Sequence, residues 1–300
     1  MDAFDQYHPQ DDVVRSIATL FGIALVAIVS LVLFDVPKML ESTGASLNPS
    51  SWEPLILIWR LSCLGVGMTA IVFMFRMKSG HMIVRSHSQK SDVLIHPLGI
   101  GKFVTFSSWT LLLNVLYFLC ATITSYLVAF GSDIQSWLQM FLAGSFVVAL
   151  GASFLTSTVV RFVILPGNFK DAEHHKRQFW FHNQVMHNFC TIFLVIELLL
   201  TNPQLEFIYM LFGILIGLLY ALFAFPFAAF GGDYYCYSFI DPRLQKAPLF
   251  ISLLTFAISF SYVGVWLISE VISFNYIIGS LLLIAWCSRI VQFKPLNMNN

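Results

Sequence analysis

Long apolar runs separated by short polar segments dominate the pattern along the chain. A transmembrane α-helix needs about 20 apolar residues to cross the hydrocarbon core of a bilayer. Eight runs approach or exceed that length, at residues 16–34, 54–75, 103–130, 137–165, 181–201, 206–230, 247–271 and 274–292. The pattern predicts eight transmembrane helices, of which the third and fourth are long enough to tilt in the membrane.

The composition indicates that lipid is the solvent for much of the chain. Hydrophobic residues make up 58% of the 300 residues, charged residues make up 11%, and the mean hydropathy is +0.78. A soluble domain carries charge at about a quarter of its positions. We therefore expect an all-α, polytopic transmembrane bundle that forms a single domain over residues 1–300, with no nucleic-acid partner. The sequence has no phosphate-binding or dinucleotide-binding glycine motif, and we expect no cofactor.

The Lys and Arg residues are distributed unevenly between the two sides of the predicted bundle. Fourteen of the sixteen belong to the termini or to every second link, including the long links at 76–102 and 166–180. The opposite side has only Lys38, and Arg60 lies inside a span. Cytoplasmic loops carry such an excess, so we predict that both termini are cytoplasmic. No targeting motif selects between the endoplasmic reticulum and the plasma membrane.

Four ionisable residues lie inside predicted spans, where a charge is costly and therefore faces protein or water. They are Arg60, His187, Glu197 and Glu270. Arg60 lies about six residues from the outer end of its span and Glu197 about four from the outer end of its own, so their depths nearly match. We predict an Arg60–Glu197 ion pair or a shared structural polar network, with Glu270 as a further member.

The histidines do not have the spacing of a metal site. His182 and His187 are five residues apart, about 140° around a helix, and together with His174 and His175 they form neither an HxxxH nor an HxxHH pattern. We therefore expect no metal. A lone buried histidine such as His187 is either a hydrogen-bonded packing residue or a catalytic base, and the residue alone does not decide between them.

Four short stretches occur in the order typical of one family. They are Lys102-Phe103-Val104-Thr105-Phe106, Asn183 to His187 followed by Ile196-Glu197, Tyr220 with Tyr237-Ser238-Phe239-Ile240-Asp241, and Tyr262 to Glu270. Together they resemble the androgen-induced and androgen-dependent multi-pass membrane proteins and the related rolling stone proteins. The resemblance covers about residues 100–275 and leaves the spans at 16–34 and 54–75 outside, although Trp59-Arg60 and Gly231-Gly232 look like the rolling stone branch.

The resemblance implies one of two functions, because the branches of the family differ. The androgen-induced branch comprises membrane-embedded hydrolases that cleave fatty-acid esters of hydroxy fatty acids with a threonine nucleophile and a histidine. It implies Thr105 as the nucleophile, His187 as the base, and membrane lipids or a fatty-acid ester as the ligand. The rolling stone branch implies a non-catalytic protein in adhesion, fusion or scaffolding. This chain departs from the hydrolase pattern at Asn188, where that branch has threonine, and at Ser238, which replaces a proline.

The hydrolase hypothesis makes a geometric demand. A threonine hydroxyl is a poor nucleophile until a base takes its proton, so the third and fifth spans must bring Thr105 and His187 together. Asn183 precedes His187 by four residues, and we expect it to orient the imidazole or to donate to an oxyanion. The reaction is then acyl transfer to Thr105 followed by release of the fatty acid by water. A transporter or receptor is the third alternative, but the inverted repeats and broken helices of transporters are not evident.

Overall fold

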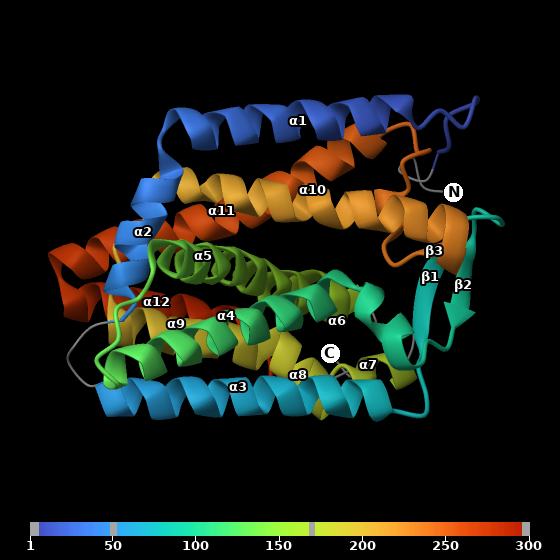
Figure 1. The fold of residues 1–300 in the computed structure, drawn as a ribbon. Helices are drawn as coiled ribbons and strands as arrows, with labels where there is room; N and C mark the ends of the chain where they lie inside the picture. Colours follow the sequence, from blue (N-terminus) through green and yellow to red (C-terminus); the bar gives the residue numbers. More distant parts are fainter. Residues whose placement is uncertain (1–5, 49–52, 168–171, 296–300) are drawn as a thin grey trace.

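The helices run side by side along most of the molecule (Figure 1). The structure, a computed structural model, describes residues 6–48, 53–167 and 172–295. Seven of its helical stretches are long and apolar enough to cross a membrane, namely Val14–Leu33, Pro54–Arg76, Phe106–Ala129, Ser136–Ile164, Phe181–Thr201, Phe207–Gly232 and Ala247–Phe274. The protein is therefore an all-α, multi-pass transmembrane bundle, as the apolar pattern predicted.

A small three-stranded sheet closes one end of the bundle, which we call the hairpin end (Figure 1). Strand β1 (Met82–Ser86) pairs antiparallel with β2 (Asp92–Ile95) on one side and with β3 (Tyr234–Tyr235) on the other. Asp233 joins the strands further, because its carboxylate accepts from the Ser88 backbone N–H at 3.0 Å and from the Ser88 hydroxyl at 2.7 Å. The long polar link at 76–102 is thus an ordered hairpin, which the helical pattern did not predict.

Most irregular helical segments, including the three described π segments, lie towards the hairpin end, whereas the 3₁₀ turn Phe207–Tyr209 lies beside α2 (Val36–Ser46). The helices and their irregular extensions are α1 (Val14–Leu33), α3 (Glu53–Arg76), a 3₁₀ turn (Gly99–Val104), α4 (Phe106–Ala129), α5 (Ser136–Val159) with a π segment (Val160–Ile164), α6 (Leu165–Gly167), α7 (Ala172–Arg177), α8 (Phe181–Gln184) with a π segment (Val185–Phe189), α9 (Cys190–Thr201), a 3₁₀ turn (Phe207–Tyr209), α10 (Met210–Phe227) with a π segment (Ala228–Gly232), a 3₁₀ turn (Ser238–Ile240), α11 (Ala247–Phe274) and α12 (Tyr276–Ile290). Isolated π turns are frequent at functional sites.

Both ends of the described chain are held at the hairpin end. Near the N-terminus, the backbone N–H of His8 donates to the Arg243 carbonyl at 2.8 Å. Near the C-terminus, the backbone N–H of Gln292 donates to the Asn188 side chain at 3.0 Å. Seven helices of the described chain are long enough to cross a membrane and α12 is shorter, so the even number of crossings and the cytoplasmic position of the termini both stay predictions.

A short helix, α2 (Val36–Ser46), lies at the opposite end of the bundle and was not apparent in the apolar pattern. It packs directly on α5, since a Cβ added at Gly44 would lie 2.1 Å from the carbonyl oxygen of Gln139. The Thr43 hydroxyl donates to the Gln204 carbonyl at 2.7 Å and ties α2 to the loop after α9. A polar link therefore folds back as part of the bundle, and we call this the α2 end.

The last predicted span is shorter than the other seven. Helix α12 has 15 residues, about 22 Å at 1.5 Å per residue, against a hydrocarbon core about 30 Å thick. Asn275 separates it from α11, and the Asn275 side chain caps α12 by accepting from the Ile278 N–H at 3.1 Å. The structure has seven full-length spans and one shorter apolar helix where eight spans were predicted.

Candidate functional site

Arg60 and Glu197 form a buried ion pair near the α2 end, as their matching depths predicted. The Arg60 Nη2 and Glu197 Oε1 atoms are 2.6 Å apart, and both side chains are fully buried. The remaining guanidinium donors reach the Asn48 side chain at 2.8 Å and the Ser125 hydroxyl at 2.6 Å. The Tyr117 hydroxyl donates to the same Glu197 oxygen at 2.8 Å. These groups link four segments of the bundle, and the charges of Arg60 and Glu197 neutralise each other, while Glu197 Oε2 is buried without a hydrogen-bond partner in the described chain.

Glu270 does not belong to this network, contrary to the prediction. It is exposed on α11, and within the described parts of the chain no hydrogen bond joins it to Arg60 or Glu197. The neighbouring Ser269 and Tyr262 occupy the buried face of α11 instead, and the Tyr262 hydroxyl donates to the Glu206 carbonyl at 2.8 Å. Glu270 lies inside a span, as predicted, but on a face of α11 that points away from the bundle.

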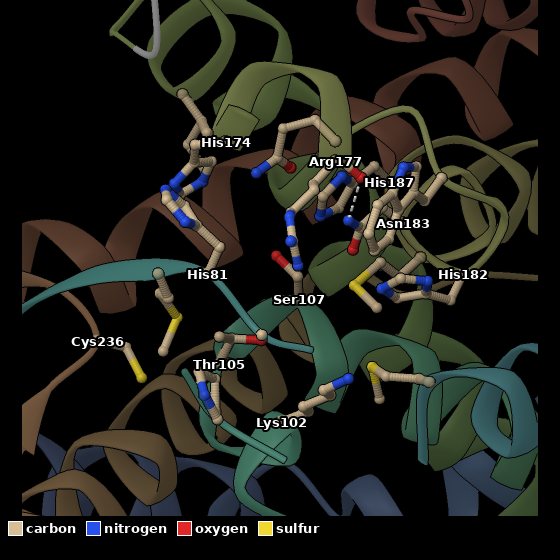
Figure 2. Close-up of a pocket in the computed structure, with 18 of the residues that line it drawn as sticks. His81, Lys102, Thr105, Ser107, His174, Arg177, His182, Asn183, His187 and Cys236 are labelled. Carbon is tan, nitrogen blue, oxygen red and sulfur yellow. Dashed lines mark hydrogen bonds between the residues drawn. The ribbon is translucent and has the colours of Figure 1, made fainter. Parts of the chain in front are cut away.

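A cavity of about 410 Å³ lies at the hairpin end (Figure 2). Thr105 and His187 both line it, so the third and fifth spans do bring the two predicted residues to one cavity. The other polar lining residues are Ser79, His81, Lys102, Ser107, His174, Arg177, Gln178, His182, Asn183, Cys236 and Tyr237, and the apolar ones include Met74, Met77, Met82, Ile83, Val163, Ile164 and Met186. No Asp or Glu is among its described lining residues.

Thr105 sits at the N-terminus of α4. Its backbone is extended, with φ −80° and ψ 151°, and its side-chain oxygen accepts from the Ser108 backbone N–H at 3.2 Å, which makes it the N-cap. The Thr105 hydroxyl donates to the Ser108 hydroxyl, also at 3.2 Å. The partial positive charge at the start of a helix favours negative charge nearby. A developing oxyanion beside Thr105 would be stabilised there.

Two tyrosines from the family-like stretches fix the backbone on both sides of Thr105. The Tyr220 hydroxyl of α10 donates to the Val104 carbonyl at 2.9 Å. The Tyr237 hydroxyl accepts from the Phe106 N–H at 3.3 Å. Tyr220 is buried and packs edge-on against the Phe106 ring, with centroids 5.3 Å apart. These contacts set the position of Thr105 in the cavity wall.

His187 lies in the π segment between α8 and α9 and is 5% exposed. Its backbone carbonyl accepts from the Ser157 hydroxyl at 2.5 Å, which anchors the segment to α5. The ring nitrogen Nδ1 is buried without a hydrogen-bond partner in the described chain. No hydrogen bond joins His187 to Thr105 among the described residues, so a proton can pass between them only after a side-chain rotation or through water.

Asn183 lines the cavity, and within the described chain no hydrogen bond joins it to His187; donation to an oxyanion, the other role expected of it, stays a prediction. Its side-chain Nδ2 donates to the Arg177 carbonyl at 2.6 Å (Figure 2). The i−4 relation to His187 assumes a regular α-helix, whereas the chain changes to a π-helix at Val185. The wider turn moves residues four apart out of register. Asn183 instead holds the α7–α8 connection.

Cationic side chains give the cavity its electrostatic character. Lys102 Nζ donates to the carbonyls of Met77 and Ser79, each at 3.3 Å. Burial, and secondarily the charge of Arg177, lowers the pKa of the Lys102 ammonium. Burial also raises the pKa of the Cys236 thiol to about 12, so this thiol stays protonated and is no nucleophile. The cavity therefore favours an anionic ligand.

Lys102 and Arg177 line the cavity although no motif in the sequence marks them as candidate site residues. Both were counted only as cytoplasmic charges, although Lys102 stands three residues before Thr105 in the first family-like stretch. His81 and His174 also line the cavity, with ring centroids 6.1 Å apart. Across residues 6–48, 53–167 and 172–295, no three His, Cys, Asp or Glu side chains are placed to hold a metal ion.

The chain matches no family model, no curated protein and no solved structure. The geometry of the cavity and the short family-like stretches are therefore the basis on which a function can be proposed.

Proposed function

We propose that this protein is a membrane-embedded hydrolase of lipid esters, with Thr105 as nucleophile and His187 as base. One observation carries the proposal: Thr105 and His187, which belong to different spans, line the same cavity at the hairpin end. The resemblance of the surrounding stretches to the androgen-induced hydrolases supports the same pair. A fatty-acid ester of a hydroxy fatty acid is the substrate class that this resemblance implies.

The reaction has two steps. Thr105 Oγ1 attacks the ester carbonyl carbon while His187 takes the hydroxyl proton, and the departing alcohol then takes that proton as its bond to the acyl carbon breaks. Water next attacks the threonyl ester and gives a proton to His187. The acid leaves as the Thr105 oxygen regains that proton, so the enzyme is restored.

The cavity wall suits each step. The N-terminus of α4 stabilises the oxyanion of the two tetrahedral intermediates. Tyr220 and Tyr237 hold the peptide groups on both sides of Thr105 and act as positioning residues. Methionine side chains, including Met74 and Met186, line the apolar part of the cavity. Met adapts its shape to irregular apolar ligands such as acyl chains.

The test is turnover by the purified chain in detergent micelles. Hydrolysis of a fatty-acid ester of a hydroxy fatty acid, followed by mass spectrometry of the released acid, should be lost in Thr105→Ala and His187→Ala. Thr105→Asn is the sharper variant, because asparagine is a good N-cap and preserves α4 but has no hydroxyl. Thr19→Ala, which removes an exposed threonine hydroxyl of α1, is the matched control and should retain activity.

The second candidate is a non-catalytic membrane protein in adhesion, fusion or scaffolding. It is favoured by the structural task of Thr105, whose side chain caps α4 and makes no hydrogen bond to His187 in the described chain. A folded wild-type protein without turnover would favour this candidate. Imaging of a tagged chain would distinguish the endoplasmic reticulum from the plasma membrane, the two locations that we consider.

A further inference from the structure

Two cationic side chains face the cavity without a carboxylate in its described wall. No described carboxylate lies within ion-pair distance of Lys102, whose ammonium has only two carbonyl contacts at 3.3 Å. Among the described residues, Arg177 has one acidic ion-pair partner, Glu173, which is half exposed and lies 2.7 Å from Nε. Two like charges at a partly buried site are costly unless an anion neutralises them.

The Arg177 guanidinium is held in place before any ligand arrives. It lies over the Trp180 ring at 4.6 Å, and its Nη1 donates to the Ser79 hydroxyl at 3.3 Å. Lys102 and Arg177 come from separate segments, the 3₁₀ turn before α4 and the end of α7, and face the cavity from different sides (Figure 2). A ligand between them must accept hydrogen bonds in several directions.

We propose that the cavity binds the phosphate group of a lipid ester through Lys102 and Arg177. A phosphate offers up to three free oxygens and up to two charges, whereas a carboxylate offers two oxygens and one charge, so a phosphate matches two separate cations better. The methionine side chains of the cavity accommodate the acyl chain beside it. This inference rests on the proposed hydrolase function only where it names the ester that is cleaved. Binding of the phosphate needs no turnover and does not depend on that function.

The position of Lys102 links the phosphate to the reaction. Lys102 precedes Thr105 by three residues and lies in the turn that leads into α4. A phosphate bound there anchors the head of the lipid next to the nucleophile, so that the ester near the head reaches Thr105. The substrate class is thus a lipid that carries both a phosphate and a neighbouring ester.

The test measures binding of dioctanoyl phosphatidate to the purified Thr105→Asn chain in neutral detergent, where turnover is blocked. Dioctanoylglycerol, octanoate and inorganic phosphate serve as comparison probes. We expect Lys102→Gln and Arg177→Gln each to weaken phosphatidate binding by about tenfold, the loss typical of a charge-assisted hydrogen bond. Lys78→Gln removes an exposed cation of the same link that does not line the cavity, and should have no effect; Lys102→Arg should restore binding.

Each outcome decides the proposal. If inorganic phosphate displaces phosphatidate at similar concentrations, the cavity recognises a phosphate group that a water-soluble compound can supply. If phosphatidate alone binds, the phosphate group comes from a lipid. Equal binding of dioctanoylglycerol or octanoate, or unchanged phosphatidate affinity in both Gln variants, would overturn it. Turnover of neutral esters without any phosphatidate binding would overturn this inference and leave the proposed hydrolase intact.

Discussion

The two polar clusters of the bundle differ in how their charges are satisfied. Near the α2 end, Arg60 and Glu197 are fully buried and pair with each other at 2.6 Å. At the hairpin end, Lys102 and Arg177 line a cavity whose described wall has no acidic residue, and the described ion-pair partner of Arg177 is the exposed Glu173, at 2.7 Å. The two charges of the first cluster neutralise each other without a ligand, whereas the second cluster has cationic donors in excess. The contrast separates charges that hold the fold from charges that are available to a ligand.

Breaking the closed cluster should have the largest effect on stability. Arg60→Met leaves the Glu197 carboxylate buried without its cation, and removal of one partner of a buried pair costs about 3–5 kcal/mol. The measurement is thermal unfolding in detergent, followed by reaction of the buried thiols of Cys63, Cys120, Cys190 and Cys287 as they become exposed. The double variant Arg60→Met with Glu197→Leu should recover much of the loss, and no recovery would contradict the assignment as a self-contained pair.

The cap of α4 should have an intermediate effect. Thr105→Ala removes the side-chain acceptor of the Ser108 N–H and should destabilise the protein by about 1 kcal/mol. Thr105→Asn should unfold at the same temperature as the wild type, because it retains the cap. It should lack turnover, because it loses the hydroxyl. The same thiol-exposure assay, run beside the turnover assay, checks both parts. If Thr105→Asn kept full turnover, the nucleophile assignment would be wrong.

Removing a cavity cation should change stability in the opposite direction to Arg60→Met. The folded pKa of Lys102 is lowered by burial and by Arg177, so the unfolded chain binds this proton more tightly than the folded chain. The free energy of unfolding therefore increases with pH between the folded pKa and the unfolded pKa of this lysine. The unfolded pKa is near the ordinary value of about 10.4. Lys102→Met should remove that increase and unfold at or slightly above the wild-type temperature at neutral pH. A clear loss of stability would mean that Lys102 belongs to the fold, as Arg60 does.

The smallest effect should come from the hairpin that covers the cavity. Hydrogen bonds from Ser88 lower the pKa of Asp233, so this contribution is present above the ordinary carboxyl pKa and is lost as pH falls through the folded pKa. Asp233→Asn should speed hydrogen exchange of the Ser88 amide at neutral pH. In this variant the protection of that amide, relative to an unstructured peptide, should no longer fall as the pH is lowered. Unchanged exchange would show that Asp233 does not hold the hairpin.

The apolar pattern predicted what lipid dictates and missed what local contacts dictate. Seven full-length spans followed from run length, because each helix must cross the same hydrocarbon core. Helix α2 was missed because it has 11 residues and mixed polarity, and it is held by contacts such as Gly44 against Gln139. The hairpin was missed because its strands are only 5 and 4 residues long.

The predicted site residues show the same difference between what lipid dictates and what local contacts dictate. Arg60 and Glu197 were paired correctly because equal depth suffices for two side chains that must leave lipid. Glu270 was wrongly assigned to the network because a position inside a span does not specify which face of the helix a residue occupies. Asn183 reaches the cavity but makes no hydrogen bond to His187 in the described chain, because a π segment at Val185–Phe189 changes the helical register and no sequence pattern marked it. Thr105 and His187 share a cavity, but their chemistry stays a prediction.

The most direct test of the account is the site of covalent labelling by a lipophilic fluorophosphonate probe. The purified wild-type chain would be labelled in detergent, digested, and the modified residue located by mass spectrometry. The account predicts an adduct on Thr105 that is absent from His187→Ala, with folding of that variant verified by thiol exposure. A fully folded wild type that carries no adduct on Thr105 would contradict the account.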